Sequence, residues 1–166
     1  MLRRILKKPH NSILLLGPRG TGKSTWIKQV MPDAPSYDLL NSKEALRLAR
    51  APGIIFDELK ILKPGTWVVI DEIQKVPALM DEVHRLIENH GLCFILSGSS
   101  VRKLKSHGTN LLAGRAILTP FFPLVSAELG KISYAKEAYI YGMLPKVITS
   151  ERPHAFWRLL HVKMVR

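Results

Sequence analysis

The sequence has very little cysteine and no long apolar run. Cys93 is the single cysteine among 166 residues, so no disulfide can form within the chain, and a reducing compartment is expected. No stretch approaches the roughly 18 apolar residues that a membrane-spanning helix needs. The apolar run behind the basic amino terminus, residues 13–16, is too short for the core of a secretory signal. We therefore expect a soluble protein of the cytoplasm.

Acidic residues are scarce at both ends of the chain. Residues 1–10 carry four basic residues and no acid, and residues 11–100 carry ten of each. Residues 101–166 carry eleven basic and three acidic residues, so the formal net charge of +12 comes from the two ends. Such an excess suits a nucleic-acid surface. It equally suits a surface that an acidic partner covers, and both interpretations stay open at this point.

Short apolar runs alternate with stretches of helical periodicity, in a composition that is ordinary for a globular domain. Strands that are buried on both faces of a parallel sheet form continuous apolar runs. The alternation therefore predicts an α/β fold with a parallel sheet. The expected strands are residues 13–16, 37–40, 67–70, 93–96 and a fifth that begins at 116, and the expected helices are residues 22–31, 42–50, 54–62 and 77–90.

The strongest local signal is a glycine-rich segment between the first strand and the first helix. Residues 17–24 form a complete GxxxxGK[ST] pattern. Glycines let backbone N–H groups surround a polyphosphate, and the following helix directs its positive end to the same place. In such a loop Lys23 contacts the β- and γ-phosphates, and the Ser24 hydroxyl binds Mg²⁺. The predicted nucleotide contacts are Gly17, Pro18, Arg19, Gly20, Thr21, Gly22, Lys23, Ser24 and Thr25.

A second signal is the acidic pair that ends the third predicted strand, Asp71 and Glu72. A carboxylate at the tip of a buried strand is costly unless it meets a cation or hydrogen-bond donors. Asp71 fits the acidic residue on the Mg²⁺ side of a nucleotide site. Glu72 fits a base that polarises water, which a hydrolase needs and a small-molecule kinase does not. A helix cap followed by a solvated acid is the alternative interpretation.

Ser97 ends the fourth predicted strand, where a hydroxyl can orient water or touch the γ-phosphate; a simple turn serine is the alternative. Arg102 and Arg115 follow and offer planar cations for phosphate charge, although solvated or paired surface arginines are equally expected.

Three of these signals lie at the ends of strands. Residues 17–24, 71–72 and 97 each follow the carboxyl end of a different predicted strand, which predicts one shared site at that edge. We expect Arg115 beside this edge too, because the fifth strand starts next to it.

Several segments, in this order, resemble one known family. They are residues 17–25, 69–77, 96–100, 111–115, 122–124 and 128–129. The chain resembles the AAA-superfamily ATPases of bacteria and archaea whose ATPase domain precedes a C-terminal domain of unknown function. The Asp-Glu-Ile-Gln-Lys-Val-Pro string at residues 71–77 is specific for that group, and the resemblance covers residues 10–149.

The resemblance implies a three-layer P-loop NTPase fold whose five-stranded parallel sheet has the order 5-1-4-3-2. It also implies a function for each candidate residue. The implied roles are ATP and Mg²⁺ binding for Lys23 and Ser24, a metal ligand for Asp71, the catalytic base for Glu72, a sensor for Ser97, and an arginine finger toward a neighbouring subunit for Arg115.

The chain departs from this family at its carboxyl end. Residues 141–148 match the segment that links the ATPase domain to the next domain, but this chain ends at Arg166. We expect an ATPase domain at residues 1–129 and, at residues 130–166, a short helical segment that begins an incomplete C-terminal region. The chain is therefore expected to be truncated, which favours an uncovered interface as the explanation of the basic carboxyl end.

The expected function is Mg²⁺-dependent hydrolysis of ATP to ADP and phosphate. One alternative is a nucleotide-binding switch without turnover, an inactive remnant of a longer ATPase. A small-molecule kinase is a further alternative, against which Glu72 and the lack of an evident acceptor pocket argue. ATP and ADP are the expected ligands, and a homo-oligomer stays open as the assembly. No membrane is expected, and nucleic acid stays open as a partner.

Overall fold

A computed structural model describes residues 2–99, 112, 114–129, 140 and 142–150. Its internal contacts divide the chain into two units. The sheet unit comprises residues 8–17 and 23–121, and the loop unit comprises residues 1–7, 18–22 and 122–166. Among the described residues, no helix is both long and apolar enough to cross a lipid bilayer.

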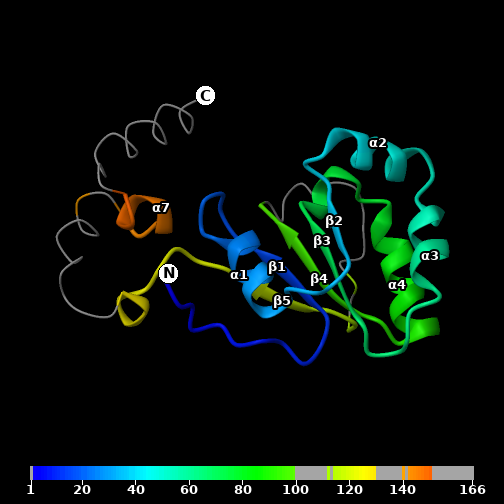
Figure 1. The fold of residues 1–166 in the computed structure, drawn as a ribbon, viewed down its shortest axis with the longest axis horizontal. Helices are drawn as coiled ribbons and strands as arrows, with labels where there is room; N and C mark the ends of the chain where they lie inside the picture. Colours follow the sequence, from blue (N-terminus) through cyan, green and yellow to red (C-terminus); the bar gives the residue numbers. More distant parts are fainter. Residues whose placement is uncertain (1, 100–111, 113, 130–139, 141, 151–166) are drawn as a thin grey trace. The chain divides into compact units, whose positions relative to one another are not determined.

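The sheet unit is built on five parallel strands with β1 between β4 and β5 (Figure 1). Every neighbouring pair is parallel, and the spatial order is β2-β3-β4-β1-β5. This is the expected order 5-1-4-3-2 counted from the other edge, so the predicted α/β P-loop NTPase fold is confirmed. The strands are β1 (Ile13–Leu16), β2 (Ser36–Asp38), β3 (Trp67–Asp71), β4 (Cys93–Gly98) and β5 (Ile117–Pro120).

Side chains of the central strands are buried on both faces of the sheet. Successive strand residues point to opposite faces. Leu14, Val68 and Phe94 belong to an apolar cluster that includes Leu79 and Val83 of α4. Their neighbours Ile13, Leu15, Val69 and Ile95 are equally buried but lie outside that cluster, as expected for the opposite face. Burial on both faces explains why these strands are continuous apolar runs in the sequence.

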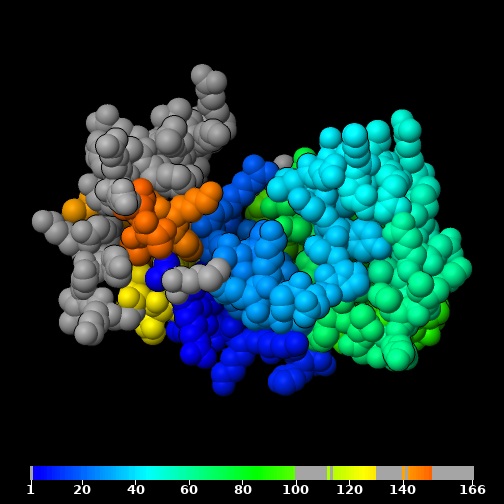
Figure 2. Space-filling view, in the orientation of Figure 1, coloured from blue at the N-terminus to red at the C-terminus, as the bar shows by residue number. Residues whose placement is uncertain are grey.

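The helices of the sheet unit lie close to their predicted ranges. They are α1 (Lys23–Val30), α2 (Ser42–Arg50), α3 (Gly53–Leu59) and α4 (Leu79–His90), with a 3₁₀ turn, η1, at Ile73–Lys75. Figure 1 shows α1 on one side of the sheet, with α3 and α4 on the other. The α2 and α3 helices form one continuous surface in Figure 2, and Arg47 of α2 pairs with Glu58 of α3 at 2.6 Å.

The loop unit gathers stretches that are far apart in the sequence. It contains the middle of the glycine-rich segment, the 3₁₀ turn η2 (Ser126–Glu128) and α7 (Pro145–Ile148). The Leu124 N–H donates a hydrogen bond to the Met143 carbonyl oxygen at 2.8 Å, which joins the segment after β5 to the start of α7. Most of residues 130–166 lie outside the described residues, so the expected domain division at residue 129 stays a prediction.

Candidate functional site

The carboxyl ends of β1, β3 and β4 bring several predicted residues together within the sheet unit. Leu16 of β1 is in register with Gly98 of β4, and the N–H of Gly17 donates to the Gly98 carbonyl oxygen at 3.2 Å. Asp71 is the last residue of β3, and Ser97 is the second-to-last residue of β4. The rule that parallel strands place their carboxyl ends at one edge therefore predicted this grouping.

Asp71 is the centre of a small oxygen cluster. The Ser24 hydroxyl donates to Asp71 Oδ2 at 2.7 Å, and the Ser97 hydroxyl donates to Asp71 Oδ1. A hydroxyl beside a carboxylate is the kind of oxygen donor pair that Mg²⁺ prefers. The described residues contain no group of three or more His, Cys, Asp or Glu that could enclose a metal ion by themselves. The donors thus fit an ion that completes its shell with water and phosphate oxygens.

Lys23 is held at the beginning of α1. The residue is only 6% exposed, and its Nζ donates to the Gly17 carbonyl oxygen at 2.6 Å. Lysine is seldom buried to this extent unless its ammonium group has partners. The ammonium group therefore lies where the glycine-rich segment leaves β1.

Glu72 has an unusual backbone and a buried carboxylate. Its φ of 60° and ψ of 45° place it in the left-handed region, which costs a residue other than glycine about 1–3 kcal/mol. Such strain is found where the surroundings force it, often at active sites. The Glu72 carboxylate accepts hydrogen bonds from Gln74 Nε2 and from the Ser99 hydroxyl, the latter at 3.2 Å. Glu72 is thus fixed beside Asp71 but with different partners.

Sequence reasoning did not assign Gln74 and Ser99 to the site. Gln74 Nε2 also donates to the Ser99 hydroxyl at 3.0 Å, so the two residues form one network around the Glu72 carboxylate. Gln74 Oε1 is buried and has no hydrogen-bond partner among the described residues. Gln74 lies inside the 71–77 string that carries the family resemblance, and this was the available signal for it.

Residues 18–22 of the glycine-rich segment belong to the loop unit. Within that unit, the Thr21 hydroxyl donates to the Pro18 carbonyl oxygen at 2.9 Å. Gly20 and Gly22 have φ values of 82° and 91°, which only glycine adopts readily. Thr25, the last predicted nucleotide contact, lies on α1 of the sheet unit.

Arg115 lies at the opposite edge of the sheet from Asp71. It precedes β5, and Ile117 of β5 is in register with Ile13, the first residue of β1. The expectation that Arg115 lies beside the carboxyl edge is therefore wrong, because a residue that precedes a parallel strand lies at the amino edge. Its role as a finger toward a neighbouring subunit stays a prediction. Arg102 lies outside the described residues.

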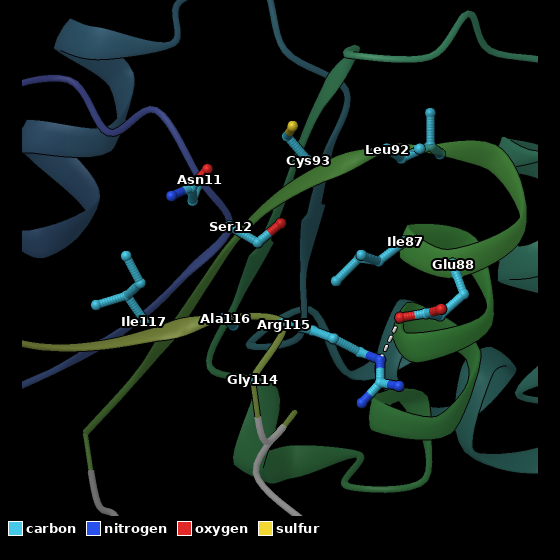
Figure 3. A pocket seen from close by; sticks show the side chains of 11 residues that line it. Asn11, Ser12, Ile87, Glu88, Leu92, Cys93, Gly114, Arg115, Ala116 and Ile117 are labelled. Atoms are coloured by element: carbon cyan, nitrogen blue, oxygen red, sulfur yellow. Dashed lines mark hydrogen bonds and ion pairs between the residues drawn. The ribbon is translucent and has the colours of Figure 1, made fainter.

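A pocket of about 570 Å³ opens at this amino edge (Figure 3). Arg115 reaches across it from the start of β5 and forms an ion pair with Glu88 of α4. The Cys93 thiol also lines the pocket, and burial raises its pKa, so that it remains a protonated thiol and a poor nucleophile. The pocket is separate from the Asp71 cluster.

Arg115→Ala should lower the free energy of unfolding by less than about 1 kcal/mol, because its ion pair with Glu88 is partly exposed and screened by water. Urea unfolding measures this change. Lys60→Ala is the matched control, since Lys60 forms an exposed ion pair with Asp57 in the same unit. A loss several times larger for Arg115→Ala than for Lys60→Ala would contradict a modest structural contribution.

The comparisons with known proteins agree with the fold. A family model described as an AAA domain matches residues 9–130. Among solved structures, the Orc1 protein of Aeropyrum pernix in complex with DNA has 18% sequence identity and a TM-score of 0.52, over 74% of this chain and 42% of that chain. The Walker-type ATPase of Pyrococcus abyssi has 17% identity and a TM-score of 0.55, over 91% of this chain and 67% of that chain.

The two solved structures bear on the fold alone, because their sequence identities are low. This chain spans less than half the length of the Orc1 chain. No curated protein matches the sequence. The family model covers most of the chain, and the sheet has the strand order expected of the fold. The chain therefore belongs to the AAA superfamily of P-loop ATPases.

Proposed function

We propose that this chain binds ATP with Mg²⁺ and hydrolyses it to ADP and phosphate. The observation that carries the proposal is the arrangement at the carboxyl edge of the sheet. The buried Lys23 and the Ser24 hydroxyl follow β1, and the carboxylates of Asp71 and Glu72 lie at the end of β3. The strand between these two, β4, brings the Ser97 hydroxyl to the same edge. Membership of the AAA superfamily supports ATP as the nucleotide.

Lys23 and the start of α1 supply the positive charge for the phosphates. The first N–H groups of a helix have no partners within the helix, and the helix dipole places positive charge there. Lys23 Nζ donates to the Gly17 carbonyl oxygen, a neutral acceptor, and a phosphate oxygen is a stronger acceptor for an ammonium group. ATP binding should therefore transfer this hydrogen bond from Gly17 to the β- and γ-phosphates.

Ser24 and Asp71 would hold the magnesium ion. Their oxygens already lie 2.7 Å apart, so both can contribute to one coordination shell without a change of rotamer. When bound, the ion neutralises charge on the phosphate oxygens. Ser97 donates its hydroxyl to the other Asp71 oxygen and so keeps the carboxylate plane oriented.

The position and backbone of Glu72 support hydrolysis of ATP rather than a nucleotide-binding switch without turnover. A nucleotide-binding switch needs the loop and the metal ligands but no base. Here a second carboxylate is buried beside Asp71, and its backbone is held in a costly conformation. A positioned carboxylate can accept a proton from the water that attacks the γ-phosphorus, while the bond from that phosphorus to the bridging oxygen breaks and ADP leaves. Phosphate release from ATP without any added acceptor separates this activity from that of a small-molecule kinase.

The Mg²⁺ dependence of ATP affinity tests the metal assignment. Wild-type protein should bind ATP about tenfold more tightly in Mg²⁺ than in EDTA, and Asp71→Asn should lose most of that difference because an amide oxygen carries no charge for the cation. Isothermal titration gives both dissociation constants.

Asp38→Asn is the matched control for this titration. Asp38 ends the neighbouring strand and is in register with Asp71, but its carboxylate caps the Leu40 N–H, a role that an amide oxygen can keep. Its Mg²⁺ dependence should equal that of wild type. An Asp71→Asn variant that keeps the full Mg²⁺ effect would remove Asp71 from the metal site.

The expected partners stay predictions. A homo-oligomer is one of these predictions. The basic stretch of residues 101–166 lies largely outside the described residues. Whether that stretch faces nucleic acid or an acidic protein surface therefore rests on its charge alone. The Orc1 protein was solved with DNA, but its likeness to this chain extends to the fold only.

A further inference from the structure

Arg4 binds a carbonyl oxygen of the glycine-rich segment itself. Within the loop unit, its NH1 donates to the Thr21 carbonyl oxygen at 2.7 Å. Its NH2 donates to the Phe122 carbonyl oxygen, also at 2.7 Å, and its Nε donates to Glu128 Oε1 at 3.0 Å. One guanidinium group thus joins the amino-terminal segment, the glycine-rich segment and the chain that follows β5.

Glu128 fixes the direction of the Arg4 guanidinium group. The two side chains are 10% and 4% exposed, so the ion pair is largely buried. The Glu128 carboxylate also accepts the backbone N–H groups of Ile5 at 2.8 Å and Val125 at 3.1 Å. Burial alone would raise the pKa of Glu128, but these hydrogen bonds outweigh it and lower the pKa below its ordinary value. Glu128 is therefore ionised at neutral pH, and it accepts one charge-assisted hydrogen bond, from Arg4 Nε. The other two donors of the planar guanidinium group are then directed at the Thr21 and Phe122 carbonyl oxygens.

The position of the Thr21 oxygen determines the direction of a neighbouring donor. The Thr21 carbonyl and the Gly22 N–H belong to one peptide plane, and none of the described peptide bonds is cis, so the two groups point in opposite directions. By holding the oxygen, Arg4 aims the Gly22 N–H away from itself. Gly22 has no Cβ to restrict its backbone, so without this contact the peptide plane can rotate at little cost.

A second contact in the segment acts in the same way. The Thr21 hydroxyl holds the Pro18 carbonyl oxygen at 2.9 Å, and this directs the N–H of Arg19 to the opposite side. Within residues 18–22, two carbonyl groups, those of Pro18 and Thr21, are therefore occupied by donors from the protein. Phosphate binding by such a segment needs its N–H groups turned toward the ligand and its carbonyls turned away.

We propose that Arg4 is a positioning residue for the phosphate loop, which holds the Thr21–Gly22 peptide so that the Gly22 N–H faces a nucleotide phosphate. This inference rests on the proposed function, since it takes nucleotide phosphate as the ligand of the loop. It also gives a role to Phe122 and Glu128, which lie in segments that carry the family resemblance. Arg4 acts through geometry, because its charge is balanced by Glu128.

Replacement of Arg4 by alanine should weaken ADP binding by about tenfold, the effect of one lost charge-assisted hydrogen bond. AMP should be affected much less, because it lacks the β-phosphate that the loop surrounds. The ratio of the AMP and ADP dissociation constants should therefore fall about tenfold in Arg4→Ala. Isothermal titration of the full chain in Mg²⁺ measures both constants, and a general loss of stability would not change their ratio.

Two further variants separate geometry from charge. Arg4→Lys keeps the charge but cannot reproduce the planar fork to a carboxylate and two carbonyls, so it should resemble Arg4→Ala. Arg3→Ala removes an exposed arginine from the adjacent position and should leave the ratio unchanged. If Arg4→Lys restores the wild-type ratio, or if Arg3→Ala lowers it equally, charge is the cause and the positioning role is overturned.

Glu128→Gln keeps the test decisive if Arg4→Ala does not fold. The amide keeps the shape of the side chain but removes the charge that orients Arg4, so the AMP-to-ADP ratio should fall in the same direction. An unchanged ratio in the folded variants, with wild type binding ADP, overturns the role of Arg4 and leaves the proposed function intact. A wild-type protein that binds neither ADP nor ATP overturns the proposed function, and this inference with it.

Discussion

Glu72→Gln should reduce phosphate release from ATP by about 10²–10⁴-fold, the usual contribution of a general base, while ATP affinity stays close to that of wild type. The glutamine amide can still accept the hydrogen bond that Ser99 donates, but it cannot take a proton from water. Lys23→Ala should instead lower the ATP affinity, because it removes the ammonium group expected to contact the phosphates. Phosphate release and isothermal titration on the same preparations separate the two.

Glu88→Gln is the matched control for the Glu72 variant. It makes the same chemical change at the amino edge of the sheet, where Glu88 pairs with Arg115, and it should leave phosphate release unchanged. Equal loss of ATP affinity in Glu72→Gln and Lys23→Ala would contradict the assignment of Glu72 as the base. Full phosphate release by Glu72→Gln would contradict it as well.

Gly17→Ala should lower the free energy of unfolding by about 3 kcal/mol, the upper end of what an overpacked core costs. A Cβ atom at this position would overlap the carbonyl oxygen of Phe121. The Phe121 backbone cannot easily move away, because its N–H donates to the Leu16 carbonyl oxygen at 2.6 Å and its ring packs against Trp26. Urea unfolding of the variant measures the loss.

Gly53→Ala provides the comparison for this steric effect. Gly53 begins α3, a Cβ there would have no atom within 4 Å, and the backbone does not have a positive φ. Alanine at such a site should be neutral or slightly stabilising, because it restricts the unfolded chain. If Gly17→Ala is as stable as Gly53→Ala, then Gly17, after β1, does not pack closely against the Phe121 backbone, after β5.

The fold could be predicted from the sequence because its signals are local. The apolar run of β1 coincides with residues 13–16, and α2 begins after Asn41, whose side-chain oxygen accepts the Lys43 N–H at 3.1 Å. The short edge strand β2 was expected at residues 37–40, but it begins one residue earlier and ends two residues earlier, at Ser36–Asp38. Its residues are mostly exposed, so no continuous apolar run marks its bounds.

The sequence could predict only those residues of the candidate site that directly follow an apolar run typical of a buried strand. Asp71 and Ser97 follow apolar runs, so the parallel sheet brings them to one edge. Arg115 was placed at the wrong edge, because it precedes its strand. The Arg4–Glu128 pair had no local signal, since the two residues are 124 positions apart and a basic amino terminus looks the same when it is fully solvated. Such pairs are determined by tertiary packing.

A crystal structure of the chain with Mg²⁺ and a non-hydrolysable ATP analogue tests the central claim most directly. We predict that Lys23 Nζ leaves the Gly17 carbonyl oxygen for the β- and γ-phosphates, that Mg²⁺ lies at Ser24 and Asp71, and that Glu72 lies within reach of a water molecule at the γ-phosphate. A nucleotide bound elsewhere, or a Lys23 ammonium group that stays on Gly17 beside the bound analogue, would contradict the proposed ATPase site.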